Sequence, residues 1–191
     1  LSLTAHKIFG PMGIGVLYVG KKPRVQLEPL FSGGGQEKGH RGGTENLICI
    51  AGFGAAADAA REALSDVGRI AALRDRLEAG LRELAPDMIL HGEAVDRLAN
   101  TSFFSLPGLK AETAQIAFDM EGVAVSAGAA CSSGKIGLSH VLAAMGADAD
   151  LGAIRISLGP EHRENDIERF LEAFKAINTR RMVRKGAEVA A

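Results

Sequence analysis

Cysteine is scarce in this sequence. The 191 residues include two, Cys49 and Cys131, which lie far apart along the chain. Such spacing argues against a disulfide framework and against a zinc cluster. A chain without a disulfide framework is typical of a reducing compartment, so we expect a cytoplasmic protein.

An excess of charge of either sign is also missing, and so is a long apolar run. The 22 basic residues nearly balance the 23 acidic ones, giving a formal net charge of -1. This balance gives no argument for binding to nucleic acid or to an anionic membrane surface. Although 47% of the residues are hydrophobic, no apolar run approaches the roughly 18 residues that span a bilayer. We therefore expect neither nucleic acid nor a membrane among its partners.

The start of the sequence lacks both an initiator methionine and the pattern of a signal peptide. It opens with LSLTAHK, which is typical of the middle of a protein. We therefore expect a fragment of a longer chain.

Glycine, by contrast, is abundant. There are 24 glycines, about an eighth of the chain against a typical share of ~7%. They are dense in FSGGGQEKGHRGGTEN, residues 31–46, where consecutive glycines let backbone N–H groups approach an anion. Arg41 and Thr44 would add donors there. No Gly-Lys-Ser/Thr follows, which excludes a Walker loop, and a flexible connection remains the alternative.

Hydrophobic periodicity predicts an α/β chain in two parts. In the first part we expect a buried strand over residues 15–20, a short strand over 27–31, and helical structure from an N-cap at Thr44 to Pro86, with the domain boundary near residues 63–66. The later elements are expected as follows: strands at 88–92, 100–106, 123–126 and 153–159, and helices at 111–121, 139–146 and from 164 or 165 to 178. The basic tail over residues 179–191 is expected to fray.

Three residues are candidates for chemistry. Lys7 follows a histidine and precedes a glycine-rich turn, which suits a Schiff-base lysine or an ordinary exposed pair. Arg155 lies on the polar face of an alternating strand, where its guanidinium needs either a bound carboxylate or phosphate, or a structural salt bridge. Cys131 lies in SAGAACSSG, whose small residues suit either a working thiol or a passive loop.

The remaining candidates favour structural roles. Cys49 lies on an apolar helical face and is expected to be a buried structural cysteine. The histidines show no spacing that indicates a metal site, so we expect no metal.

Together the motifs resemble those of the NifS/IscS-type cysteine desulfurases, which belong to the class V aminotransferase superfamily. The matching stretches are SLTAHKIFGPMGIGVLYVG, GGGQEKGHRGGTEN, SAGAACSSG, and SHVLAAMG followed by IRISLG. They occur in family order from residue 1 to about 177. The resemblance implies fold-type I of the enzymes that use pyridoxal 5'-phosphate (PLP). Residues 1–64 would end the large PLP-binding domain, and residues 65–178 would form a small α+β C-terminal domain.

The resemblance also implies a role for each matching cofactor residue. Lys7 falls on the lysine that binds PLP covalently and later moves the Cα proton of the substrate. Thr4 and His6 fall on positions that hold the PLP phosphate. Thr44 falls on a threonine that reaches the phosphate of the neighbouring subunit, which implies a homodimer.

Two further residues match positions that act on the substrate. Cys131 falls on the nucleophile, which takes sulfur from L-cysteine as a persulfide while L-alanine is released. Arg155 falls on the residue that binds the substrate α-carboxylate. The stretch around Cys131 would then be a mobile arm that delivers sulfur to an acceptor or to an iron–sulfur scaffold protein.

The N-terminal half of the family's fold, which carries further PLP contacts, has no counterpart here. We therefore expect the full-length protein to be an enzyme and these 191 residues alone to be inactive. Two alternatives remain: another class V PLP enzyme, such as an aminotransferase or a selenocysteine lyase, and an inactive fragment that acts as an interaction domain.

Overall fold

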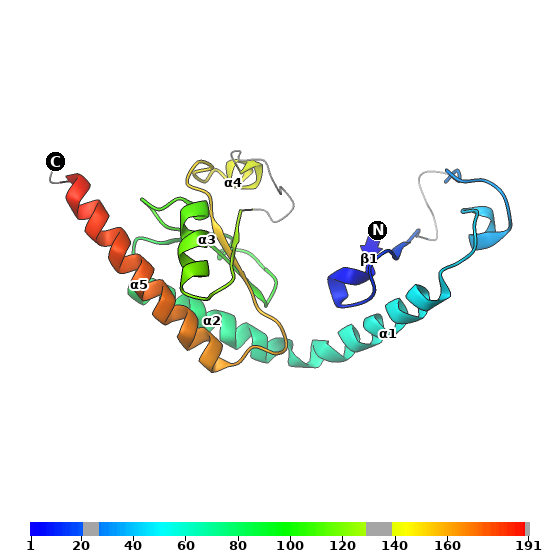
Figure 1. Cartoon of the computed structure of the whole chain (residues 1–191), viewed down its shortest axis with the longest axis horizontal. Coiled ribbons are helices and arrows are strands. Elements are labelled where there is room, and N and C mark those ends of the chain that lie inside the picture. Colours follow the sequence, from blue (N-terminus) through cyan, green and yellow to red (C-terminus); the bar gives the residue numbers. More distant parts are fainter. Residues whose placement is uncertain (21–26, 129–138, 190–191) are drawn as a thin grey trace. The chain divides into compact units, whose positions relative to one another are not determined.

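The chain divides into two units, Leu1–Ser65 and Asp66–Ala191, and the division falls one residue from the boundary expected after residue 64. The computed structural model describes residues 1–20, 27–128 and 139–189 (Figure 1). Cys131 therefore lies outside the described residues.

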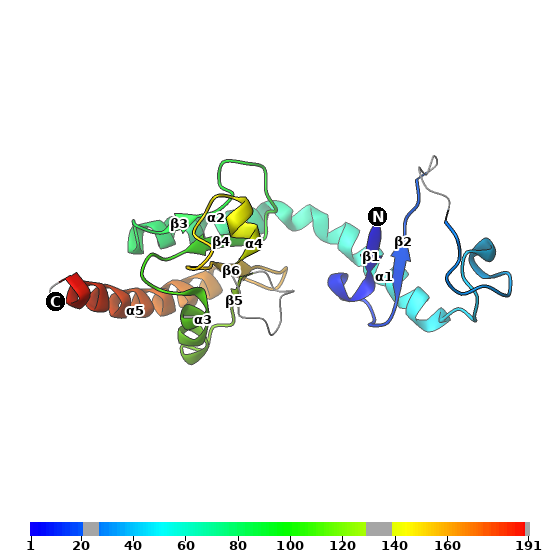
Figure 2. The same cartoon turned by 90° about the horizontal axis from the view of Figure 1, so that it is seen from above.

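The first unit is a small hairpin followed by a long helix (Figure 2). Its elements are β1 (Ser2–Thr4), the 3-10 helix η1 (Ala5–Ile8), β2 (Gly15–Leu17), the 3-10 turn η2 (Gln36–Gly39) and α1 (Leu47–Ala63). Strands β1 and β2 pair antiparallel, with Leu3 opposite Val16. Residues 27–31, expected as a strand, are irregular.

Burial in this unit differs from the expectation. Among its described residues Ala5 is the only one that is buried, and the side chains of Val16 and Leu17 in β2 are 47% and 59% exposed. The prediction of a buried strand over residues 15–20 is therefore wrong for the described chain. A β-branched, apolar segment is suited to burial. The segment itself does not show which other residues would cover it.

Helix α1 begins two residues later than the sequence predicted. The side-chain Oδ1 of Asn46 accepts the backbone N–H of Cys49 at 3.1 Å, which makes Asn46 the N-cap. The prediction that Thr44 is the cap is wrong, because Asn46 lies directly before the first helical turn and reaches the free N–H with a shorter loop.

The second unit contains a four-stranded antiparallel sheet in the order β3-β4-β6-β5. The short turn η3 (Leu64–Asp66) precedes it. The elements of the second unit after η3 are α2 (Val67–Leu84), β3 (Ile89–Leu90), β4 (Thr101–Ser105), α3 (Ala111–Met120), β5 (Ser126–Ala127), α4 (His140–Ala144), β6 (Ile154–Ser157) and α5 (Glu164–Val189). Helices α2 and α5 contact each other along the core (Figures 1 and 2).

Alternation along the strands builds the core of this unit. In β6, Ile154 and Ile156 are buried, whereas Arg155 and Ser157 face the other side of the sheet. The helices add an aromatic stack in which the rings of Phe118 and Phe170 lie 5.0 Å apart. Other core residues are Leu73, Leu77, Leu81, Phe104, Ile167 and Phe174.

The basic tail does not fray at residue 179, because α5 continues to Val189. Arg181 is buried in this part of the helix and donates to both carboxylate oxygens of Asp87, at 2.6 and 3.1 Å, and to the Pro107 carbonyl at 2.8 Å. Asn178 donates to the Leu84 carbonyl at 2.7 Å. The expectation that the chain frays from residue 179 is therefore wrong, since distant segments hold α5 at Asn178 and Arg181.

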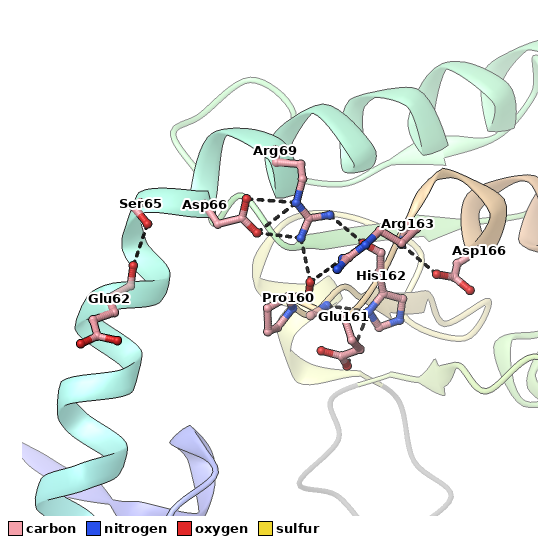
Figure 3. A network of polar contacts seen from close by, with 10 residues as sticks. Glu62, Ser65, Asp66, Arg69, Pro160, Glu161, His162, Arg163 and Asp166 are labelled. Carbon is pink, nitrogen blue, oxygen red and sulfur yellow. Dashed lines mark hydrogen bonds and ion pairs between the residues drawn. The ribbon is translucent and has the colours of Figure 1, made fainter.

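A second network joins the first turn of α2 to the loop before α5 (Figure 3). Arg69 binds the Asp66 carboxylate through Nε and Nη2 and donates to the carbonyls of His162 at 2.6 Å and Pro160 at 2.8 Å. One guanidinium thus joins the start of α2 to the loop before α5.

Candidate active site

The sequence-predicted residues of the first unit cluster around η1. Thr4 Oγ1 lies 2.9 Å from His6 Nδ1, because the extended Thr4 directly precedes the 3-10 turn. Lys7 is exposed, and the described part of the chain offers its Nζ no hydrogen bond or ion pair. The turn closes at Phe9, whose φ of 63° is strained for a bulky side chain. The local fold therefore places an exposed lysine directly after a histidine that is paired with a hydroxyl.

The glycine-rich loop is closed on itself. The Gly42 N–H donates to the Phe31 carbonyl at 2.8 Å. A Cβ at Gly42 would lie 2.6 Å from the Gly33 carbonyl oxygen, so this position requires glycine. Arg41 Nη1 donates to the carbonyls of Gly42 and Gly43. Arg41 thus supports the loop, whereas Thr44 is exposed and has no partner among the described residues.

A hollow of about 1020 Å³ lies within the first unit. Its walls include Leu3 and Val16 of the hairpin, Phe53 of α1, and Arg41 and Thr44 of the loop. Thr4, His6 and Lys7 do not line it. The structure therefore brings together Thr4 and His6, with Lys7 next in sequence, and places Thr44 at a different surface.

In the second unit, the Arg155 side chain makes one hydrogen bond among the described residues. Its Nη2 donates to Ser126 Oγ at 3.4 Å. The Nε atom is buried and has no partner, and no carboxylate among the described residues forms an ion pair with Arg155. The structural salt bridge that was the alternative interpretation is therefore absent from the described chain, and the guanidinium remains able to bind an anion.

The other candidates give a less specific picture. Cys49 is half-buried rather than buried, and its Sγ lies 3.9 Å from the Met12 carbonyl oxygen. Burial lowers the pKa of His91, whose Nε2 lies 2.7 Å from Ser105 Oγ. Within the described ranges no group of three or more potential metal ligands occurs. None of the helices in those ranges has the length and apolar character needed to cross a membrane.

Comparison with known proteins decides the family. The model of the family "Aminotransferase class-V" matches residues 1–170. The chain belongs to this family. A cysteine desulfurase of Sinorhizobium fredii is 42% identical over 180 residues, covering 93% of this chain and 46% of the relative. A cysteine desulfurase IscS of Clostridium botulinum is 39% identical over 187 residues, covering 95% and 47%. The resemblance seen in the motifs is thereby confirmed.

Solved structures agree with this family. A NifS-like protein matches this class V chain with a TM-score of 0.78 and 35% identity, covering 93% of the chain and 45% of the other protein. An apo cysteine desulfurase from Thermococcus onnurineus, at 22% identity and a TM-score of 0.73, supports the fold alone. The predicted fold class, α/β of PLP fold-type I, is confirmed. The chain spans about half the length of the curated relatives that it matches.

Sequence reasoning missed Ser126 as a neighbour of Arg155. Ser126 lies directly opposite Arg155 in the pairing of β5 with β6. The two residues are distant in sequence, and β5 has two residues only, so periodicity carries no signal for their pairing.

Proposed function

We propose that the full-length protein is a PLP-dependent cysteine desulfurase that converts L-cysteine to L-alanine and leaves a persulfide on Cys131. The observation that carries this proposal is the guanidinium of Arg155, which has a buried Nε and no carboxylate partner in the described chain. Such a group suits the α-carboxylate of an amino acid. The relatives that the chain matches are named cysteine desulfurases, which supports the choice of this reaction.

The residues around η1 fit the cofactor. Lys7 has the free amine that a covalent bond to PLP needs, and the Thr4–His6 pair lies within the same turn as donors for a phosphate. Thr44 would serve the phosphate held by a second subunit. When bound, PLP supplies an electron sink for the electrons released at the substrate Cα.

Each remaining step belongs to side chains of this protein. Arg155 binds the carboxylate and so orients the Cα–H bond. The Lys7 amine takes the Cα proton. The Cys131 thiolate forms a bond to the substrate sulfur while the Cβ–S bond breaks with its electrons moving to Cβ. A proton added at Cβ and the return of a proton to Cα complete L-alanine.

The nucleophile is tested in the full-length protein with L-cysteine and a thiol reductant. Cys131→Ser should abolish sulfide release and keep the cofactor absorbance, whereas the matched control Cys49→Ser should keep both. Sulfide release by Cys131→Ser would refute the assignment.

Lys7→Ala should abolish the covalent attachment of PLP, which mass spectrometry after borohydride reduction detects.

We further propose a homodimer with shared sites, which fits the separation of Thr44 from the Lys7 turn. Lys7→Ala and Thr44→Ala subunits should each be impaired as homodimers. A mixed dimer contains one site with both residues intact, so co-expression should restore up to half of the activity per dimer. Absence of restoration in a purified mixed dimer would refute sharing.

The proposed role is to supply sulfur in the cytoplasm, either to iron–sulfur cluster assembly or to another acceptor. Residues 1–191 alone are proposed to be inactive. Transfer of an amino group to a keto acid without sulfide would instead indicate an aminotransferase. Release of selenide from selenocysteine, but no sulfide from L-cysteine, would indicate a selenocysteine lyase. If the full-length protein binds a scaffold protein but does not turn over L-cysteine, its role would be that of an interaction domain.

A further inference from the structure

Arg155 lies between two strands that offer it unequal neighbours. Antiparallel pairing places Phe103 of β4 opposite it on one side and Ser126 of β5 opposite it on the other. Directly paired residues project from the same face of a sheet. One neighbour is a hydrocarbon ring and the other carries a hydroxyl, so a polar restraint on the guanidinium comes from the β5 side.

The hydroxyl of Ser126 is the hydrogen-bond partner of the guanidinium among the described residues. Nη2 donates to Ser126 Oγ at 3.4 Å, while Nε is buried and has no partner. The contact to an uncharged oxygen leaves the positive charge of Arg155 without a compensating carboxylate among the described residues. Ser126 therefore restrains Arg155 without neutralising it.

The backbone around Ser126 is itself held in place. On one side, Gln115 of α3 donates through Nε2 to the Val125 carbonyl at 3.2 Å. On the other side, the Gly128 N–H donates to the Ala153 carbonyl at 2.7 Å. A hydroxyl on a strand fixed at both ends is a more accurate anchor than one on a free loop.

We propose that Ser126 is a positioning residue, which orients the Arg155 guanidinium to bind the α-carboxylate of an amino-acid substrate. The inference rests on the proposed function of Arg155. Ser126 does not contact the substrate. It limits the rotation of a long side chain, so less conformational entropy is lost when the carboxylate binds.

The kinetic test uses the full-length enzyme with L-cysteine. Ser126→Ala should raise KM three- to tenfold, the range that one hydrogen bond supports, and leave kcat within twofold. Ser126→Thr keeps the hydroxyl and should restore KM. Ser157→Ala is the matched control, because Ser157 is exposed on the same face of β6 and its hydroxyl has no partner in the described part of the chain. An unchanged KM in Ser126→Ala would overturn the proposal.

Calorimetric binding separates positioning from a general structural effect. Ser126→Ala should weaken the binding of L-alanine three- to tenfold. The affinity for L-alaninamide, which lacks the carboxylate, should stay unchanged. In an Arg155→Met background Ser126→Ala should have no further effect. Equal weakening of both ligands, or an additive effect with Arg155→Met, would refute the proposal.

Failure of the proposed function gives a different result. A parent enzyme that binds L-alanine but releases no sulfide from L-cysteine refutes the desulfurase assignment, and calorimetry then still decides the role of Ser126. A parent that does not prefer L-alanine to L-alaninamide refutes the carboxylate site and with it the role of Ser126.

Discussion

At the scale of single residues, Gly152 is a position where a small change should be costly. Its φ is +71°, and an added Cβ would lie 2.9 Å from the Cβ of Ala111 at the start of α3. Ala111 has no flexible side chain that turns away. We expect Gly152→Ala to lower the free energy of unfolding by about 2–4 kcal/mol, through backbone strain and overpacking together.

The matched control is Gly146→Ala, since Gly146 has a φ of +70° and nothing within 4 Å of an added Cβ. It should show the backbone strain without the clash, about 1 kcal/mol. Urea unfolding of both variants measures the difference. Equal losses would show that the Ala111 contact has no effect.

His91 should make stability depend on pH. Burial lowers its pKa below the ordinary value for histidine, because it disfavours the charged imidazole in the folded protein. The unfolded chain binds the proton at about pH 6.5, and stability therefore falls as pH decreases below that value. His91→Gln keeps a donor for Ser105 but does not titrate. The drop in the urea midpoint between pH 7.5 and 5.5 should be larger in the parent than in His91→Gln, and an equal drop would contradict this.

At the scale of elements, the end of α5 depends on Arg181. Replacing it with methionine leaves the Pro107 carbonyl and the half-exposed Asp87 without their arginine, and we expect a loss of about 2–3 kcal/mol after allowing for solvent around Asp87. Arg180→Met breaks an exposed pair with Glu121 and should cost at most about 1 kcal/mol. Thermal unfolding compares the two, and equal losses would exclude a special role for Arg181.

The stability that Asp87 contributes through its contact with Arg181 should be lost in acid. The hydrogen bond from Arg181, supported by Lys185, lowers the pKa of Asp87 from 3.8 to about 2. A lowered carboxyl pKa stabilises the fold above pH 3.8, and this contribution is lost as pH falls toward 2. In Arg181→Met the decrease in melting temperature over that range should be smaller than in the parent.

Elements were predictable where the signal is local. Alternation of Ile154 and Ile156 with Arg155 predicted β6, and Ser139 was correctly predicted to cap α4. The course of α5 beyond residue 178 was not predictable, because Asp87, the partner of Arg181 on the α2–β3 turn, lies 94 positions away. Thr44 was a good cap by type, but Asn46 lies closer to the first turn.

The candidate site follows the same division. Its residue types were identified from motifs, and Thr4 and His6 are adjacent because they lie two positions apart. The contact of Ser126 with Arg155 spans 29 positions and depends on the order of strands in the sheet. Strand order depends on tertiary packing, which local patterns do not specify.

At the scale of the whole molecule, the two units should differ in local stability. The second unit contains an extended core, whereas Ala5 is the only buried residue of the first unit within the described ranges. Local opening requires little free energy where few apolar contacts are lost. In residues 1–191 as an isolated polypeptide, amides of β4 and β6 should exchange hydrogen at least tenfold more slowly than those of β1 and β2. Equal protection, measured by mass spectrometry, would contradict this expectation.

The contacts of Arg69 also constrain the order in which the second unit forms during synthesis. They join residues 91 and 93 positions apart, and α2 packs along α5, the last element of the chain. A ribosome that has made α2 and α3 has therefore not yet supplied α5, the helix that packs against a face of each. At 5–20 residues per second, those faces stay uncovered for several seconds, which is when a nascent chain most needs a chaperone.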